Sequence, residues 1–326
     1  MEALIRAFRG KRVVVIGDVV ADEFVYGRVA RVSREAPVLI LEYDSTEIVP
    51  GGAGNAANNI AALGGQVALV AALGRDDAGK RVVAALHRRV DSRLLVRRSD
   101  TTTAVKTRIL AGGVHSAKQQ IVRIDRVPRT VDPRSRQAIE TAALSAVSQA
   151  DAVLVSDYGS GIVTPALVRR IATQLRREGH PIPILVDSRY KLLEYTGLTM
   201  STPNESEVEQ ALGVRIGDDL RALERAGREM LTRTNMQAVL VTRGSRGMAL
   251  FVAGSRTVHI PISGTEFIVD VTGAGDTVVA TVTLALAAGG TFEAAARLAN
   301  YAGGMVVMKR GTATVSADEL RTALNG

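Results

Sequence analysis

The sequence predicts a doubly wound α/β fold with a mostly parallel central sheet and a small antiparallel β lid. Short, uninterrupted apolar runs of the kind found in buried parallel strands alternate with helical segments. Two further stretches, at about residues 22–47 and 103–125, are β-rich and contain no helical pattern between their strands. A chain of 326 residues without repeats or an obvious linker can bury one large core. We therefore expect one domain over residues 1–326, with those two stretches forming the lid.

The elements of the main domain alternate, except where the two lid stretches interrupt them. The strand-like runs lie at Arg12–Gly17, 67–70, 152–155, 182–186 and 238–241, and the helical segments at 56–63, 78–89, 133–149, 165–177 and 220–233. A further apolar segment at 278–288 is too short to span a bilayer and reads as a buried helix. In sheets of this class, ligands bind beyond the carboxyl ends of the strands. Polar motifs that directly follow a strand are therefore the first candidates for a site.

The two lid stretches carry apolar strands whose edges a monomer would leave exposed. One contains Val38-Leu-Ile-Leu41 and the other contains Gln120-Ile-Val-Arg-Ile-Asp125. Exposed strand edges invite pairing with a second chain or closure over a ligand. We expect a homodimer that pairs through the lids, each lid helping to cover a ligand site.

Composition excludes several classes of function. The chain has no cysteine, which rules out disulfides, thiolate metal sites and cysteine nucleophiles. Its four histidines are far apart and lack metal-ligand spacing. The formal charge is +8, but aromatic residues make up only 3% and tryptophan is absent, so a nucleic-acid partner is not expected. The amino terminus lacks the features of a signal peptide, and we expect a cytoplasmic protein without a membrane partner.

The strongest motif is Asp270-Val-Thr-Gly-Ala-Gly-Asp276, which precedes an apolar helix. Small residues at a helix start let an anion approach the free backbone N–H groups, and the helix dipole favours negative charge there. Asp276 is placed to accept a proton from a hydroxyl that attacks a phosphoryl group, with Gly273, Ala274 and Gly275 forming the anion cradle. The alternative is a simple helix cap, because Asp and Gly are common at helix starts.

A second motif, Pro50-Gly-Gly-Ala-Gly-Asn55, opens a helix that runs to Gly64. The Gly51-Gly52 pair permits close approach of a ligand or of the lid, and Asn55 offers both a donor and an acceptor to a hydroxyl. Alanine-rich packing explains the rest of this helix. It does not explain the paired glycines and the three asparagines.

These two motifs resemble the two signatures of the ribokinase/phosphofructokinase-B family of sugar kinases, in the family's order. Within that family the chain is most similar to the kinases of D-glycero-D-manno-heptose 7-phosphate, enzymes of lipopolysaccharide-core synthesis. Further matching segments span nearly the whole chain: Gly17-Asp18-Val-Val-Ala-Asp22, Val32–Val38, Val105–Arg108, Gln119–Asp125, Ser156–Gly159, Thr202–Glu207 and Gly311–Ser316. The resemblance implies a ribokinase-like fold and transfer of a phosphoryl group from ATP with Mg²⁺, with K⁺ as a candidate monovalent cation. It implies the anomeric hydroxyl of the heptose 7-phosphate as acceptor and a 1,7-bisphosphate as product.

The resemblance also implies roles for individual residues. It places Asp18, Asp22, Gly51, Gly52 and Asn55 at the sugar. Asn204 and Glu207 would organise the metal, through water, and the nucleotide phosphates; the open alternative for this pair is a helix cap. Thr242, Arg243, Gly244 and Asn300 would bind the nucleotide. On the lid, Lys106, Arg108 and Arg123 are candidates for the substrate phosphate, or else part of a solvated strand face.

Two departures from the heptose kinases fall on the expected substrate side. Asp187-Ser-Arg189 stands where those enzymes have Asp-Pro-Lys, and arginine and lysine are not interchangeable. Residues 112–118 form an insertion between two lid strands. A kinase of another sugar, such as fructose or ribose, therefore stays open, as does a non-catalytic sugar- or nucleotide-binding regulator. Related bifunctional enzymes carry a nucleotidyltransferase domain after the kinase; since this sequence ends at Gly326, we expect that activity to be absent.

Overall fold

The computed structural model describes residues 1–99, 101–112, 118–128, 133–263 and 269–325. Most of the insertion noted above, residues 113–117, lies outside the described residues. Among those that are described, no helix combines the length and apolarity needed to cross a membrane.

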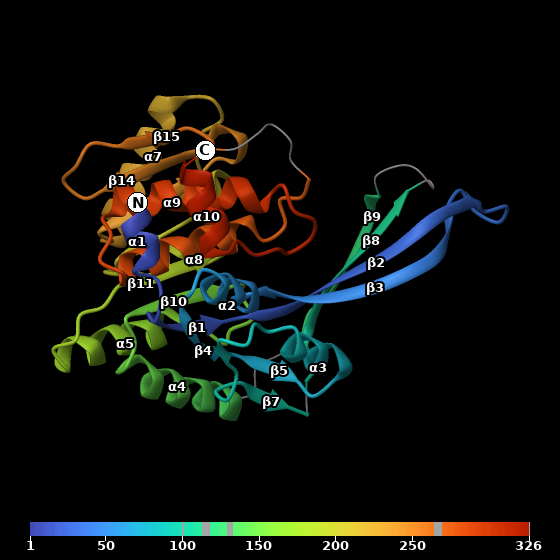
Figure 1. Ribbon diagram of the computed structural model, residues 1–326, viewed down its shortest axis with the longest axis horizontal. Coiled ribbons are helices and arrows are strands. Elements are labelled where there is room, and N and C mark those ends of the chain that lie inside the picture. Colours follow the sequence, from blue (N-terminus) through green and yellow to red (C-terminus); the bar gives the residue numbers. More distant parts are fainter. Residues whose placement is uncertain (100, 113–117, 129–132, 264–268, 326) are drawn as a thin grey trace.

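A nine-stranded sheet forms the centre of the molecule, as the alternating pattern predicts (Figure 1). Seven strands are parallel, and two antiparallel strands that the sequence did not indicate extend one edge. The order across the sheet is β15 (Val258–Ile260), β14 (Met248–Val252), β13 (Ala238–Thr242), β12 (Met200–Ser201), β11 (Ile184–Ser188), β10 (Ala152–Asp157), β1 (Arg12–Gly17), β4 (Gln66–Val70) and β6 (Val90–Asp91).

Helices cover both faces of this sheet, because its strands are buried on both sides. Along β1, Val13 and Val15 join one core cluster while Val14 and Ile16 join the other, as the two-residue period of a strand requires. One face packs against α1 (Glu2–Arg6), α2 (Ala53–Ala62), α8 (Ala274–Ala287), α9 (Phe292–Val306) and α10 (Ala317–Asn325). The other packs against α4 (Pro133–Val147), α5 (Pro165–Arg177), α6 (Glu205–Leu212) and α7 (Leu220–Thr234).

The lid is a separate four-stranded sheet that projects from the main body (Figure 1). Two antiparallel hairpins build it, β2 (Val19–Val32) with β3 (Leu39–Gly52), and β8 (Ala104–Gly112) with β9 (Gln119–Arg126). Its two inner strands, β2 and β8, run parallel. Near its base lie α3 (Asp77–Ala84) and the pair β5 (Ala72–Gly74) and β7 (Val96–Arg98); short 3₁₀ turns, η1 (Leu192–Glu194) and η2 (Gly244–Arg246), complete the described elements.

The order of the sheet strands brings several polar segments to one edge. From β1 the chain proceeds to β4 on one side and later to β10, β11, β12 and β13 on the other. Such a reversal leaves a crevice at the carboxyl ends of β1 and β10. Asp18 follows β1, Tyr158 follows β10 and Arg189 follows β11, so all three lie at this edge.

Candidate active site

Asp276 lies in the first turn of α8, the predicted buried helix, and is only 4% exposed. The turn before it needs Gly273, whose φ is +78° and where an added Cβ would come within 2.5 Å of the Asn55 amide nitrogen. No side chain caps this helix. Among the described residues, the backbone N–H groups of Gly275 and Asp276 find no acceptor, and open space faces Gly275. The helix start thus offers free donors beside a carboxylate, which suits an anion.

A chain of hydrogen bonds fixes the position of the Asp276 carboxylate. The Asn55 amide donates to Asp276 Oδ2 over 2.9 Å, and the Tyr158 hydroxyl donates to Oδ1 over 3.1 Å. The orientation of the Asn55 amide is set in turn by Asn59, which donates to Asn55 Oδ1 over 3.0 Å. The hydroxyl of Thr277 donates to Asn59 Oδ1 over 3.1 Å. Four side chains from α2, α8 and the segment after β10 therefore hold one carboxylate.

Burial raises the pKa of Asp276 to about 7. The hydrogen bond that Asn55 donates lowers this pKa, whereas the negative charge of Asp22 raises it. The hydrogen bond from Tyr158 and the positive charge of Lys106 lower it as well. A carboxyl group that titrates near neutral pH can accept a proton and release it again under ordinary conditions. Asp276 is therefore a candidate general base.

We expect kcat/KM to rise with pH through about 7 and then level off, because only the ionised carboxylate accepts a proton. In Asn55→Ala the rise should move to higher pH, since the variant lacks a hydrogen bond that lowers this pKa. Asn58→Ala is the matched control, because Asn58 lies on the same helix but bonds to Ala85 and His87. An unchanged pH profile in Asn55→Ala would refute this account of the Asp276 pKa.

A cavity of about 170 Å³, the Asp276 cavity, opens beside this carboxylate. It brings together residues that the sequence pointed to separately: Asp22, Gly52, Lys106, Arg108, Arg123, Gly273 and Asp276. Gly51 lies next to it, where an added Cβ would come within 2.2 Å of the Asp22 carboxylate. Gly51 therefore makes room for Asp22 of the lid strand β2, whereas an added Cβ at Gly52 would come within 2.5 Å of the Asp18 carbonyl oxygen.

The predicted ligand-binding carboxylates are already engaged within the protein. Asp22 is 5% exposed, accepts a hydrogen bond from Arg108 over 2.6 Å and accepts another from the Thr312 hydroxyl over 3.1 Å. Asp18 is 3% exposed and accepts the backbone N–H groups of Tyr158 and Ser160. Asp18 thus holds the segment after β10 that carries Tyr158 to Asp276.

The three lid cations differ in what they contact. Arg108 is bound to Asp22, and Arg123 forms a two-pronged pair with Asp125, its neighbour two residues along β9. Lys106 forms no ion pair with a described residue, and its ammonium lies 4.9 Å from the centre of the Tyr158 ring. Burial lowers the Lys106 pKa. Lys106 is therefore the lid cation with unused donors at this cavity.

A second cavity, of about 440 Å³, lies over the carboxyl ends of β12 and β13 and contains most of the predicted nucleotide-binding residues. We refer to it as the Glu207 cavity; Asn204, Glu207, Thr242, Arg243 and Gly244 line it. A bridge between Asn204 and Thr242 brings the two segments together.

Two side chains at or near the Glu207 cavity are committed to structural contacts. Arg243, whose side chain is 6% exposed, pairs with Glu205 over 2.8 Å. Asn300 is 5% exposed, donates to the Pro261 carbonyl over 2.8 Å and does not line this cavity. Its proposed place near the nucleotide thus has no support from the cavity.

The Asn204 and Glu207 pair forms the capping box that stood as the alternative to metal binding. Asn204 Oδ1 accepts the Glu207 N–H, and Glu207 Oε2 accepts the Asn204 N–H, each over 2.9 Å. Burial raises the pKa of Glu207, and burial together with the Glu207 charge raises that of Asp187. Two partly buried carboxylates whose negative charges repel each other suit a cation. A magnesium ion that keeps most of its waters needs only one or two carboxylates from the protein, so Asp187 and Glu207 fit it. The described residues contain no group of three or more metal-ligating side chains. The involvement of K⁺ as a monovalent cation stays a prediction.

Sequence reasoning missed Tyr158 as a site residue, and it noted Arg189 only as a departure from the heptose-kinase pattern on the substrate side, without giving it a role. Tyr158 follows β10 directly and reaches Asp276. Arg189 follows β11 and lines both cavities. Both residues directly follow apolar strands, and the same position had singled out Asp18. This signal could have identified Tyr158 and Arg189 as well.

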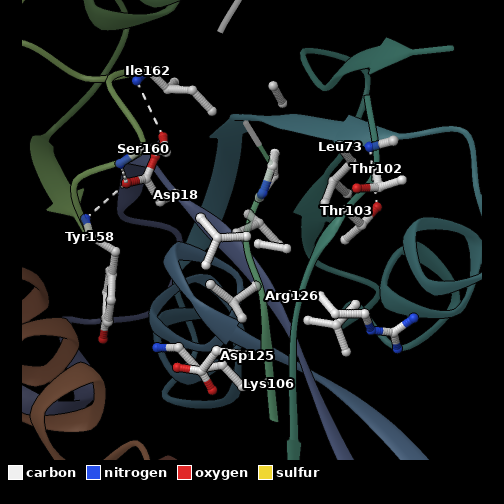
Figure 2. A pocket seen from close by; sticks show the side chains of 18 of the residues that line it. Asp18, Leu73, Thr102, Thr103, Lys106, Asp125, Arg126, Tyr158, Ser160 and Ile162 are labelled. Atoms are coloured by element: carbon white, nitrogen blue, oxygen red, sulfur yellow. Dashed lines mark hydrogen bonds between the residues drawn. The ribbon is translucent and has the colours of Figure 1, made fainter. Parts of the chain in front are cut away.

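A third cavity, the Thr103 cavity of about 220 Å³, adjoins the Asp276 cavity. Figure 2 shows Asp18, Tyr158 and Ser160 on one side of it and Leu73, Thr102 and Thr103 on the other. Lys106, Arg123, Tyr158 and Arg189 border both of these cavities.

Comparison with known proteins agrees with this geometry. A model of the pfkB family of carbohydrate kinases matches residues 11–319. The bifunctional protein HldE of Caulobacter vibrioides is 41% identical over 321 residues, which cover 97% of this chain and 64% of that protein. The protein of the same name from Geobacter sulfurreducens is 40% identical over 309 residues, which cover 94% of this chain and 61% of that protein. The chain thus spans less than two thirds of the length of these relatives.

Solved structures support the fold. Arabidopsis thaliana ribokinase, complexed with ribose and ATP, has a TM-score of 0.75 at 20% identity and covers 97% of this chain and 99% of its own. Escherichia coli phosphofructokinase-2 in complex with fructose-6-phosphate has a TM-score of 0.77 at 18% identity, covering 97% and 98%. The predicted ribokinase-like fold, with a large mostly parallel sheet and a smaller sheet, is confirmed.

Proposed function

The chain belongs to the pfkB family of carbohydrate kinases and is an ATP-dependent carbohydrate kinase; on this premise we propose that its acceptor is D-glycero-D-manno-heptose 7-phosphate. The observation that carries the catalytic part is Asp276, a buried carboxylate whose pKa is about 7 and which lies beside free N–H groups at a helix start. Support for the heptose comes from the segments that resemble heptose kinases, which span nearly the whole chain.

In the proposed reaction the anomeric hydroxyl enters the Asp276 cavity and the nucleotide enters the Glu207 cavity. The hydroxyl gives its proton to the Asp276 carboxylate, and its oxygen forms a bond to the γ-phosphorus of ATP. The bond between that phosphorus and the β–γ bridging oxygen breaks, and ADP leaves with the electron pair. The N–H groups of Gly275 and Asp276 face the transferred phosphoryl group. The products are ADP and a sugar 1,7-bisphosphate.

Magnesium would be held near Glu207 and Asp187, mainly through water, and would supply charge neutralisation at the nucleotide phosphates. The residues of the chain do the remaining work. Asn55 and Tyr158 hold the base in place, and Lys106 supplies positive charge at the acceptor.

A phosphorylated acceptor should be preferred over the free heptose. Lys106 supplies the unpaired positive charge of the lid at the Asp276 cavity, where Arg108 and Arg123 are already paired with carboxylates, and an uncharged sugar has no need of that charge. We expect a lower KM for heptose 7-phosphate than for heptose in a coupled assay of ATP consumption. Lys106→Met should raise the KM for the sugar phosphate more than that for ATP. Equal or better activity on free fructose or ribose would refute the heptose assignment and leave the kinase chemistry standing.

We also propose a homodimer that pairs through the lids. All eight residues of β9 are exposed, with Val122 at 46% and Ile124 at 49%, and Val38, directly before β3, is 56% exposed. Ile124→Glu should leave the fold intact but weaken self-association, because a charge on an apolar interface is costly. Sedimentation velocity at micromolar concentration should give a dimer for the wild type and a monomer for the variant. A monomeric wild type would overturn the proposal.

A further inference from the structure

Arg189 stands where the three cavities meet. It lines the Asp276 cavity, the Glu207 cavity and the Thr103 cavity. The sheet explains this position: β11, which ends directly before Arg189, lies between β10 on the Asp276 side and β12 and β13 on the Glu207 side. The backbone N–H of Arg189 donates to the Asp157 carbonyl at the end of β10 over 3.1 Å, which fixes the start of the side chain.

The guanidinium of Arg189 differs from those of its neighbours in forming no ion pair with a described carboxylate, although its charge opposes the rise in the pKa of Asp187 and of Glu207. Arg108, Arg123, Arg126, Arg243 and Arg246 each pair with a carboxylate. Among the described residues no carboxylate lies within ion-pairing distance of Arg189, and its guanidinium lies 5.9 Å from the centre of the Tyr190 ring. The side chain is exposed. Its donors are therefore available to a ligand that reaches both cavities.

We propose that Arg189 is a catalytic residue that binds the phosphoryl group while it moves from the Glu207 cavity to the Asp276 cavity. A phosphoryl group in transit is the one part of the reacting system that must occupy the boundary between them. During transfer, negative charge spreads over its three equatorial oxygens. Two parallel N–H groups of a guanidinium can bind two of those oxygens at once, which an ammonium cannot do in the same way.

This role also gives a reason for arginine at the position where the sequence departs from the heptose-kinase pattern. The inference rests on the phosphoryl transfer proposed above but not on the identity of the acceptor. Lys106, the other cation without an ion pair, lines the Asp276 and Thr103 cavities but not the Glu207 cavity. It can therefore serve the acceptor alone.

The test separates binding from turnover in four variants at three arginines. Arg189→Gln should lower kcat on the order of 10³-fold, as removal of an arginine from a phosphoryl-transfer site does, with little change in either KM. Arg189→Lys should recover at least about tenfold of that loss, since it restores the charge without the planar fork. Arg246→Ala, which touches only the Glu207 cavity, should act mainly on the KM for ATP. Arg176→Gln, on the far surface of α5, should leave all constants unchanged.

The acceptor in this experiment is whichever of heptose 7-phosphate, fructose or ribose gives the highest wild-type turnover. Failure of the heptose assignment then appears in the wild type, while failure of the Arg189 inference appears only in the variants. Thermal melting should be the same for Arg189→Gln and wild type, because the exposed side chain supports no ion pair. A kcat for Arg189→Gln within about twofold of wild type, or a loss confined to KM, would overturn the inference. A loss of kcat that Arg189→Lys does not relieve would overturn it as well.

Discussion

Asp276→Asn should lower kcat on the order of 10²–10⁴-fold while ATP still binds. The amide occupies the same space but cannot take up the acceptor proton. Kinetics with saturating sugar, together with calorimetric titration of ATP, separate the two effects. Near-normal turnover would exclude Asp276 as the base, and a loss of ATP binding would point to a disrupted site rather than to missing chemistry.

The same variant should be more stable than the wild type above pH 7. The pKa of Asp276 is about 7 in the folded protein and near 3.8 in the unfolded chain, so the unfolded state ionises first. The free energy of unfolding of the wild type therefore falls as pH rises from about 4 to 7, by an amount of up to roughly a few kcal/mol. Asparagine carries no such penalty. Urea unfolding at pH 8 should show the variant to be the more stable protein, and a less stable variant would mean that its inactivity reflects misfolding.

Arg108→Ala should destabilise the fold by about 3–5 kcal/mol, because it leaves a buried carboxylate without its partner. The side chains of Arg108 and Asp22 are 11% and 8% exposed and are joined over 2.6 Å. Arg123→Ala is the matched control on the neighbouring strand. Its side chain is 45% exposed and pairs with Asp125 at the surface, where an ion pair contributes about 0–1 kcal/mol.

Urea unfolding of both variants measures the difference directly. Asp22→Asn combined with Arg108→Ala should recover part of the lost stability, because the buried charge is then absent. Equal stability of Arg108→Ala and Arg123→Ala would contradict the account of this ion pair. A raised KM in Arg108→Ala is also predicted from the resemblance, and it can be assigned to the substrate only after the folded fraction has been measured.

Local sequence pattern predicted the main elements because each strand and helix carries its own signal. The ranges predicted for β1 and α5 agree with the structure. Where tertiary contacts intervene, the boundaries moved. The predicted helix at 78–89 ends at Ala84, and the Asn58 side chain accepts the N–H of His87 over 2.8 Å. The strand expected from residue 182 begins at Ile184, because Pro183 has no N–H to donate.

Those parts of the site were predictable in which one short sequence motif contains all the residues that the structural feature needs. The glycines before Asp276 and the pair at Gly51 and Gly52 fall into this class. The pairing of Asp22 with Arg108, 86 residues apart in the chain, does not, because it depends on the register between β2 and β8. Neither strand's sequence alone indicates that the two strands run parallel or which residues lie opposite each other. The place of Arg189 between two cavities likewise follows from strand order.

The most direct test of the central claim is ATP consumption by the wild type with heptose 7-phosphate, with the product identified by ³¹P NMR. We predict one ADP formed for each sugar, and a product with one phosphate at the anomeric carbon and one at the original position. The Asp276→Asn protein should form this product on the order of 10²–10⁴-fold more slowly. ATP consumption no faster than without sugar, or phosphate attached to a different hydroxyl, would contradict the account.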